Sequence, residues 1–362
     1  MKSVKTSKEK HRHPAGLLSA LLLLILFISV SLYLFVSLFN DFISESYYAG
    51  GFLNTLSNPI FAIFFGAIAS VIVRSSSIII TILAAMVTAG YPFVEAIYIL
   101  MGANIGTTFH GSLLNKLPEC DIYDKQRMSA ITSMHYFNNV IAFCVFFPLQ
   151  ISTNFLGHIS ELIVGWFVKL KEWLFSATYE SVYSWDSPAV IQVIQTHLEM
   201  NSYPGISLLL LFIVIALLMR LFFIFLRLLF DSFVIQMLDV QMMHEKVEEK
   251  ILLFGILASS ILQSSSSTFY VLMPLIRKVS CSSRSFYPLI LGINVGTCFT
   301  TIFFSLILQS KTGLAIGMAH LLYNFFALIV LTYVPLLREL PILASSQLAF
   351  CSYDSNTQDD NK

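Results

Sequence analysis

Long apolar runs, separated by short polar connections, make up most of this chain. The first run covers residues 15–38 and is long enough to cross a bilayer as a helix, at about 1.5 Å per residue. This pattern predicts an all-α polytopic membrane protein. Five later runs are read as further full-length spans: residues 91–109, 128–150, 205–230, 285–308 and 313–337.

Two other apolar stretches are interrupted by polar residues. Residues 52–90 contain "RSSS" at 74–77, and residues 251–279 contain "QSSSS" at 263–267. The apolar piece after the first interruption is about 14 residues, or about 20 Å as a helix, which is too short to cross a membrane. We therefore expect each stretch to form two half-length helices that meet at a serine-rich tip. Such a re-entrant hairpin is tolerated only where its tip is buried in protein or lines an aqueous cavity.

The polar interruptions belong to a longer internal repeat. A polar run that recurs within a matched series of motifs indicates a site that both halves of the chain help to build. Three motifs occur twice, in the same order and at similar spacing: "GAIASVIVRSSS" from Gly66 with "GILASSILQSSS" from Gly255, "GANIGTTF" from Gly102 with "GINVGTCF" from Gly292, and "HYFNNVIAF" from His135 with "HLLYNFFAL" from His320.

Charge predicts the orientation of each span. Hydrophobic residues make up 56% of the 362 residues and charged residues only 12%, with a mean hydropathy of +0.77, which excludes an ordinary soluble domain. Basic residues occur in the segments at 2–12, 116–127 and 277–284 and, at 220–227, towards the inner end of the span 205–230, whereas acidic residues prevail in the connection at 151–204. Because basic connections remain on the cytoplasmic side, both ends of this sequence are predicted to be cytoplasmic.

On this path the first repeat begins outside and the second begins inside. The halves are therefore predicted to be two inverted-topology repeats, an arrangement typical of secondary transporters with a site near the membrane midplane.

The run at 15–38 is too long for an ordinary signal peptide and is read as an uncleaved anchor. The predicted organisation is a cytoplasmic basic tail (1–14), a first transmembrane helix and external linker (15–51), a first transport repeat (52–150), an external connection (151–204), a linking helix and cytoplasmic loop (205–250), a second transport repeat (251–337) and a cytoplasmic tail (338–362), disordered in its "SYDSNTQDDNK" end.

Several other classes of protein are excluded by residue content. Nothing in the charge pattern indicates nucleic-acid binding. An intramembrane serine hydrolase would have Ser264 to Ser267 and His320 available, but no GxSxG context occurs, so we expect no enzyme activity. The cysteines lack CxxC or Cys/His spacing, so neither a zinc site nor a disulfide framework is indicated: they are Cys120, Cys144, Cys281, Cys298 and Cys351.

The repeated motifs bring the chain close to a known family. It resembles the type II sodium-dependent phosphate cotransporters, whose repeats each have a QSSS run, a following GxNxGT and a later helix with His and Asn; the resemblance covers residues 66–148 and 255–335. It implies sodium-coupled symport of inorganic phosphate by alternating access, with sodium as coupling ion and no other cofactor. The short connection at 151–204, which has no cysteine, is typical of a bacterial-type member, placed in the bacterial inner membrane.

The chemistry of the two ions suggests roles for the polar residues. Phosphate needs several hydrogen-bond donors, which serine hydroxyls and half-helix N-termini supply. Sodium needs neutral oxygens, which hydroxyls and amide carbonyls supply. The candidate phosphate ligands are Arg74, Ser75, Ser76, Ser77, Ser264, Ser265, Ser266 and Ser267. The candidate sodium ligands are Gln263, Ser265, Thr268, Asn104, Thr107, Asn294 and Thr297. The residues expected to hydrogen-bond to these ligands are His135, Asn139, His320 and Asn324.

Each assignment has a structural alternative. A serine in a membrane helix often bonds the carbonyl one turn earlier or allows neighbouring helices to approach. Asn104 and Asn294 can join helices to one another instead of binding an ion. The glycines of the GxNxGT motifs are equally compatible with close helix packing: Gly102, Gly106, Gly292 and Gly296.

Two residues depart from the family pattern. Arg74 stands where the first repeat of the family has glutamine, and Tyr136 stands where electrogenic animal members have aspartate. An arginine at membrane depth requires a specific partner or water. Its guanidinium can hold phosphate oxygens and replace one sodium ion, or its long stem can carry it away to water. Transport of another anion, such as sulfate or a dicarboxylate, and phosphate sensing without transport remain alternative functions.

Overall fold

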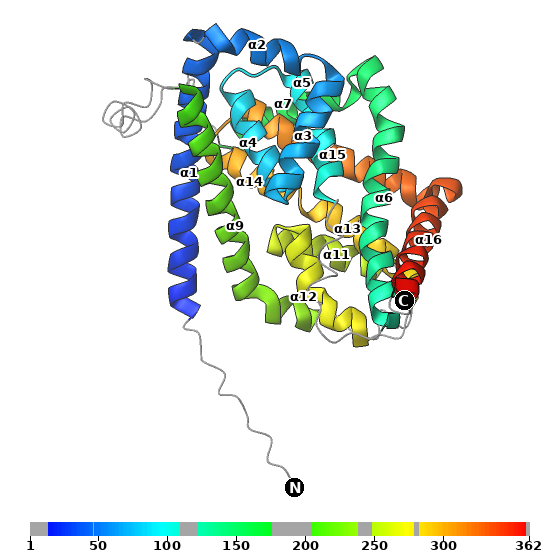
Figure 1. Ribbon diagram of the computed structural model, residues 1–362. Coiled ribbons are helices and arrows are strands. Elements are labelled where there is room, and N and C mark those ends of the chain that lie inside the picture. Colours follow the sequence, from blue (N-terminus) through cyan, green and yellow to red (C-terminus); the bar gives the residue numbers. More distant parts are fainter. Residues whose placement is uncertain are drawn as a thin grey trace.

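The computed structural model describes residues 14–45, 47–108, 122–175, 204–237, 248–278 and 282–359, which are almost entirely helical (Figure 1). Within these ranges, five helices are long and apolar enough to cross a membrane, or up to seven if each of two bent helix pairs counts as one span. The prediction of an all-α polytopic membrane protein is confirmed. In chain order the elements are α1 (Pro14–Glu45), α2 (Tyr47–Leu56), α3 (Pro59–Val73), α4 (Ser76–Thr88), α5 (Phe93–Thr107), α6 (Ile122–Thr153), α7 (Phe155–Phe175), α9 (Pro204–Met237), α11 (Glu248–Leu262), α12 (Ser265–Lys278), the 3₁₀ helix η3 (Ser283–Phe286), α13 (Tyr287–Gly296), α14 (Phe299–Ile307), α15 (Lys311–Tyr333) and α16 (Pro335–Asp359).

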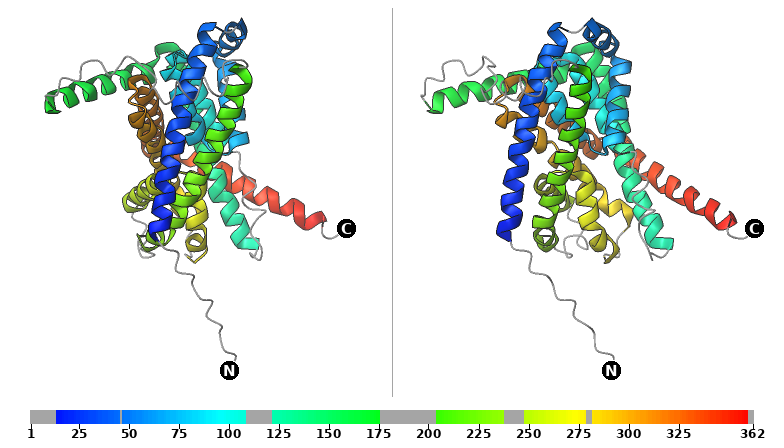
Figure 2. Two further views of the ribbon diagram at one scale, coloured as in Figure 1. Left: turned by 90° about the vertical axis from the view of Figure 1, so that its left-hand side faces the viewer. Right: turned by 60° about the vertical axis from the view of Figure 1, so that its left-hand side comes forward.

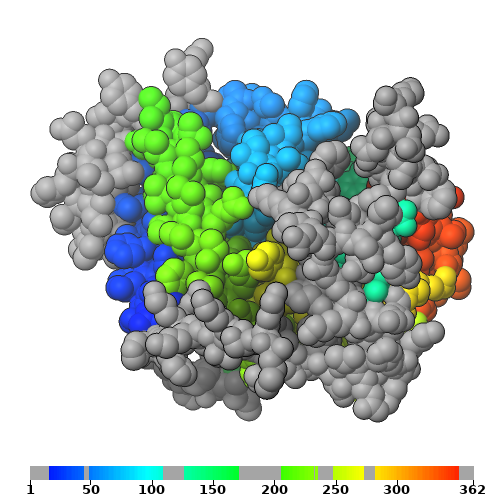
Figure 3. Space-filling model, turned by 60° about the horizontal axis from the view of Figure 1, so that its bottom comes forward, coloured from blue at the N-terminus to red at the C-terminus, as the bar shows by residue number. Residues whose placement is uncertain are grey.

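The long helices α1 and α9 lie side by side along one edge of the molecule (Figures 1 and 3). Their outer faces expose large apolar side chains such as Leu22, Phe27 and Leu209, while Ile28 and Ile215 are fully buried on their inner faces. A helix with apolar side chains on both faces suits lipid on one side and protein on the other. The pair therefore borders the rest of the bundle, as expected of a wall that faces lipid.

Both serine runs interrupt a helix. After α3, Arg74 has φ 58° and ψ 35°, and the Ser75 hydroxyl accepts a hydrogen bond from the Ile78 amide at the start of α4. After α11, Gln263 has φ 55°, and the Ser264 hydroxyl accepts one from the Ser267 amide. A left-handed residue ends the first helix and a serine caps the next. The breaks lie where the sequence predicts them, and α11 and α12 meet at 116°.

Glycines allow the helix before each break to lie against a helix that follows it. A methyl group added at Gly102 of α5 would lie 2.0 Å from the backbone oxygen of Ile63 in α3. In the second half, one added at Gly292 of α13 would lie 2.3 Å from the backbone oxygen of Leu252 in α11. No side chain fits at either contact, so the close-packing interpretation of these glycines holds.

Two helices that follow the long helices α6 and α15 pack across the molecule. Helix α7 follows α6 but packs on α15, where Val164 contacts Leu314 and Ala315 in a small apolar cluster. Helix α16 follows α15 but packs along α6. Figure 2 shows both helices extending away from the bundle on opposite sides. Each half of the chain thus provides a helix that covers the other half.

Parts of the C-terminal half differ from the sequence predictions. The segment after 335 is helical as far as Asp359, so the prediction of a disordered end is wrong up to that residue. Because Ile342 and Ala349 are buried, tertiary packing stabilises the first part of α16, and helix propagates from a formed helix more easily than it nucleates. The predicted span at 285–308 is confirmed as an apolar helical segment, Ser283–Ile307, that is long enough to cross a membrane; within it α13 ends at Gly296 and α14 begins at Phe299.

Candidate functional site

The first serine tip faces a threonine-rich segment of the second half. Ser75, Ser76 and Ser77 are all buried. The Ser77 hydroxyl donates to the backbone oxygen of Thr297, at 3.3 Å. One turn further along α4, the hydroxyls of Thr81 and Thr301 lie 3.3 Å apart. The segment between α13 and α14 is therefore joined to the first tip by oxygen-bearing groups.

The second tip contacts the same segment. Thr300 donates its hydroxyl to the side-chain oxygen of Gln263, at 2.6 Å, while the Gln263 amide nitrogen donates to the backbone oxygen of Ser260. Ser264, Ser265 and Thr268 of this tip are buried, and Ser266 and Ser267 are partly exposed. Residues 297–301 consequently touch both tips, although the tips lie far apart in sequence.

Each half provides a histidine that hydrogen-bonds an asparagine of the other half. His320 Nε2 lies 3.2 Å from the side-chain oxygen of Asn104, and His135 Nε2 lies 2.5 Å from that of Asn294. Since an amide oxygen only accepts, the ring nitrogen is the donor in both bonds. The pairing fixes both asparagine side chains and leaves each amide oxygen a second lone pair for a cation.

The later asparagines extend this network. Asn139 accepts from the Asn294 amide at 3.3 Å and donates to the backbone oxygen of His135. Asn324 donates to the backbone oxygen of His320 at 3.1 Å and lies 3.2 Å from the Cys298 sulfur. Both therefore hydrogen-bond to residues of the His–Asn pairs or next to them, and their role in supporting ion ligands stays a prediction.

The hydroxyls of Thr107 and Thr297 already donate hydrogen bonds within the protein. The Thr107 hydroxyl lies 2.6 Å from the hydroxyl of buried Ser70 and 3.0 Å from the backbone oxygen of Ala103. The Thr297 hydroxyl donates to the backbone oxygen of Asn294, at 2.8 Å. A hydroxyl that donates in this way still offers its oxygen as an acceptor, which is the part that a cation uses.

Arg74 is exposed, unlike the three buried serines that follow it. Among the described residues its guanidinium makes no hydrogen bond or ion pair. An arginine at a helix break can reach several ångströms on its long stem. The geometry leaves it free to point towards the tip or to solvent.

Sequence reasoning overlooked several polar residues around the tips. Thr300, Thr301 and Thr81 contact tip residues or each other, and Ser70 bonds Thr107. The signal for the first two was the hydroxyl-rich "GTCFTTIF" that continues the second GxNxGT motif.

Within the described ranges, no group of three or more His, Cys, Asp or Glu side chains is placed to hold a metal ion. The oxygens that surround the tips come from neutral hydroxyls, amides and backbone carbonyls. Such groups suit a weakly bound monovalent cation or an anion that needs donors.

Comparison with known proteins identifies relatives. A sequence model of the family described as Na+/Pi-cotransporter matches residues 47–166 and 237–334. The chain is 35% identical to sodium-dependent phosphate transport protein 2A of Ovis aries over 113 residues, which are 31% of this chain and 18% of that protein. It is 34% identical to sodium-dependent phosphate transport protein 2B of Homo sapiens over 110 residues, which are 30% of this chain and 16% of that protein. The matched stretches thus span less than a fifth of these curated relatives. No solved structure matches the chain.

Proposed function

Because this chain belongs to the Na+/Pi-cotransporter family, we propose that it moves inorganic phosphate across a membrane together with sodium ions. It is a multi-pass membrane protein of a transporter family. The observation that carries the proposal is the contact of residues 297–301 with both serine tips, through Ser77 and Gln263. Binding at one tip can change the other through this segment, which is a requirement for coupled transport.

The ions are assigned to neutral oxygens and donors at the tips. Phosphate is bound by the serines of both tips, with Arg74 as an additional donor, and sodium by Gln263, Ser265 and Thr268, with Asn104, Thr107, Asn294 and Thr297. With no fixed carboxylate among these ligands, the two ions neutralise each other. Joint binding is then more favourable than binding of either ion alone.

The two halves are proposed to be inverted repeats that exchange access between the two sides. The reciprocal His–Asn bonds, the left-handed residues Arg74 and Gln263 and the matched glycine contacts support this relation. In Figure 1, α3 descends from α2 at the upper end, whereas α11 and α12 lie in the lower part of the molecule, the end at which α1 begins. A bacterial inner membrane with both chain ends in the cytoplasm fits the charge of the connections.

The direct test is uptake of radiolabelled phosphate into proteoliposomes. We expect uptake to require an inward sodium gradient and to fail when potassium replaces sodium. Addition of unlabelled sulfate or a dicarboxylate distinguishes the alternative substrates, because a true substrate competes. The proposal would be contradicted if unlabelled phosphate failed to reduce the uptake of radiolabelled phosphate, or if uptake did not depend on sodium. Sodium-dependent phosphate binding without uptake would favour a sensor.

The same assay addresses Arg74. A guanidinium that stands in for a sodium ion repels a cation within about 4 Å by roughly 4 kcal/mol at an effective dielectric near 20. Arg74→Gln is therefore expected to raise the sodium Hill coefficient and to weaken sodium-independent phosphate binding. An unchanged Hill coefficient with unchanged phosphate affinity would show that Arg74 points to solvent.

Orientation can be tested by chemical labelling. In a variant whose own cysteines are replaced, Ser181→Cys in the connection at 151–204 is expected to react with an impermeant maleimide from outside the cell. Gln241→Cys, in the loop before α11, is expected to react only after the membrane is opened. The opposed charge of the two connections is the physical reason. Labelling of both positions from the same side would rule out the inverted relation.

A further inference from the structure

A row of hydroxyl groups joins α4 to the segment that contains α14 (Figure 1). The hydroxyl residues of α4 lie on one face of the helix, as their spacing in the sequence requires. Each meets an oxygen of the other segment, at 3.3 Å, 3.3 Å and 2.5 Å in turn: Ser77 with the backbone oxygen of Thr297, Thr81 with the hydroxyl of Thr301, and Thr88 with the hydroxyl of Ser310. We call these residues, together with Ser305 of α14, the hydroxyl seam.

Ser305 has a buried hydroxyl without a partner. It lies one turn after Thr301 on α14 and is 1% exposed, and among the described residues its hydroxyl makes no hydrogen bond. Thr81, by contrast, donates to the backbone oxygen of Ser77, one turn earlier in its own helix. Because Ser305 shares the face of Thr301, its hydroxyl points to the place where α4, α14 and α15 pack together. A buried polar group of this kind indicates a water molecule or an ion that satisfies it in another state of the protein.

The hydroxyl seam is long enough to connect the first tip with the membrane surface. From Ser77 to Thr88 the helix is about 16 Å long, at about 1.5 Å per residue. This is about half of the hydrocarbon thickness, which is about 30 Å, so the length suits a path that begins near the midplane. The far end of the seam lies beside the exposed residues Gly90, Gln309 and Lys311. The proposed orientation places this end on the external side.

The chemistry of the hydroxyl seam suits a monovalent cation. Neither α4 nor α14 contains a charged side chain. Hydroxyl oxygens placed one after another can replace the water molecules around sodium step by step, whereas phosphate needs several donors that converge on it. When the helices separate, each hydroxyl exchanges a protein partner for water or an ion. Opening this contact therefore costs less than opening an apolar one.

We propose that the hydroxyl seam is the route by which sodium reaches the first tip from the external side, with Ser305 as a ligand on the way. The proposal rests on the proposed function of sodium-coupled transport. The hydroxyls meet across the seam in this structure, so the route is closed here. A shift of α14 away from α4 opens it, as alternating access requires of one side at a time.

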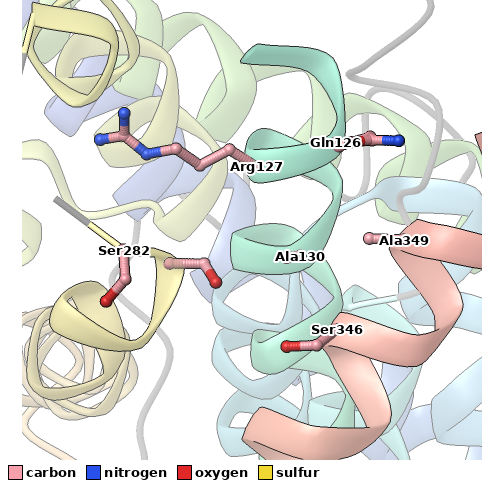
Figure 4. A pocket seen from close by; sticks show the side chains of 7 residues that line it. Gln126, Arg127, Ala130, Ser282, Ser346 and Ala349 are labelled. Carbon is pink, nitrogen blue, oxygen red and sulfur yellow. The ribbon is translucent and has the colours of Figure 1, made fainter. Parts of the chain in front are cut away.

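The hydroxyl seam is separate from the other polar features of the molecule. Alignment of the two serine runs places Tyr270 and Arg277 of the second half at the positions of Thr81 and Thr88. The repeat itself therefore does not require hydroxyls along the helix that follows a tip. The surface cavity of Figure 4 also lies elsewhere, because the described residues that line it belong to α6, to α16 and to the start of η3 or the residue before it.

The test is chemical labelling of single introduced cysteines from the external side. Ser305→Cys and Thr81→Cys are made in the full chain, and intact cells are treated with (trimethylammonium)ethyl methanethiosulfonate, a thiol-specific cation that does not cross membranes. Leu83→Cys is the matched control, because Leu83 lies on the opposite face of α4 and is as buried as Thr81, at 1% exposed. The mass of the purified protein records the modification, with the parent chain as the reference for its own five cysteines.

In potassium buffer we expect Ser305→Cys and Thr81→Cys to be modified about tenfold faster than Leu83→Cys or more, since only the seam positions are exposed by opening. Sodium should slow the reaction of Ser305→Cys several-fold, because it occupies the same route. Equal rates at the three positions, or no reaction at either seam position, overturn the proposal, and a rate that sodium does not slow overturns the assignment to sodium. If Thr81→Cys does not fold, Ser305→Cys alone decides.

A second pair of variants tests the ligand role of Ser305. Ser305→Thr and Ser305→Val have nearly the same shape and differ in the hydroxyl. In radiolabelled phosphate uptake, Ser305→Val is expected to need about fivefold more sodium than Ser305→Thr for half-maximal rate. Equal sodium dependence in the two variants contradicts the ligand role.

The two assays separate failure of the route from failure of the proposed function. Labelling is read from the mass of the protein and does not depend on phosphate uptake. Absence of sodium-driven uptake in the parent chain contradicts the proposed function. Uptake by the parent chain without labelling at the seam positions overturns the route alone.

Discussion

Gly102→Ala is expected to lose most of the folded protein from the membrane. The added methyl would lie 2.0 Å from the Ile63 oxygen and 2.9 Å from the Ile63 Cα, and both are backbone atoms that cannot rotate away. Helices α3 and α5 must then separate, and overpacking of this kind costs about 3 kcal/mol. The helix before the first tip would lose its support. Fluorescence-detected size-exclusion chromatography and the thermal midpoint of the purified protein measure the loss.

Gly165→Ala is the matched control. Gly165 lies within α7, and no heavy atom lies within 4 Å of the position that its methyl would occupy. The same substitution there should be neutral or stabilise the helix by up to about 1 kcal/mol, since alanine has the higher helix propensity. Equal stability of the two variants would show that the contact between α3 and α5 relaxes without cost.

Gln263→Ala is expected to reduce sodium-driven phosphate uptake by tenfold to about a hundredfold while the protein stays folded. The side-chain oxygen of Gln263 accepts from Thr300 at the second tip, and it is proposed to contact sodium. A hydrogen bond or ligand contact to an ion is worth about 1.5–3 kcal/mol, which corresponds to this range. Initial rates at several sodium concentrations separate weaker sodium binding from a slower transport step.

Gln309→Ala provides the comparison for Gln263→Ala. Gln309 also has a positive φ, of 52°, but it is exposed and follows α14 rather than either tip. At both positions a residue with a Cβ atom already has a left-handed conformation, so the exchange of glutamine for alanine changes backbone strain little at either one. A similar loss of uptake in the two variants would show that the effect is not specific to the second tip and would contradict the assignment of Gln263 to the site.

Local features were predictable from the sequence. A serine accepts from an amide a few residues later in its own chain, so the runs at Ser75 and Ser264 marked where α4 and α12 begin before any fold was known. The internal glycines were ambiguous. Their packing depends on which helix lies opposite, and that is settled only when α3 meets α5.

Partners across the two halves were not predictable. The residues of each half indicate that His135 and His320 need polar partners, but not that each takes an asparagine of the opposite half. Thr300 was overlooked for a similar reason, because its bond to Gln263 joins two segments whose approach has no local signal. From the sequence, the end of α16 is predicted to be a disordered polar tail. Its helical state depends on the packing of the first part of the helix, which the local sequence does not show.

The packing of α16 along α6 bears on how the protein is made. A ribosome completes α6, which ends at Thr153, well before it reaches Pro335, where α16 begins. Until then the surface of α6 that α16 covers must face lipid, a chaperone or the membrane insertion machinery. In the same way, α7 is synthesised before α15, the helix on which it packs. Neither half of the nascent chain can mature by itself, and a prematurely terminated polypeptide would present these uncovered helices to the proteases of membrane quality control.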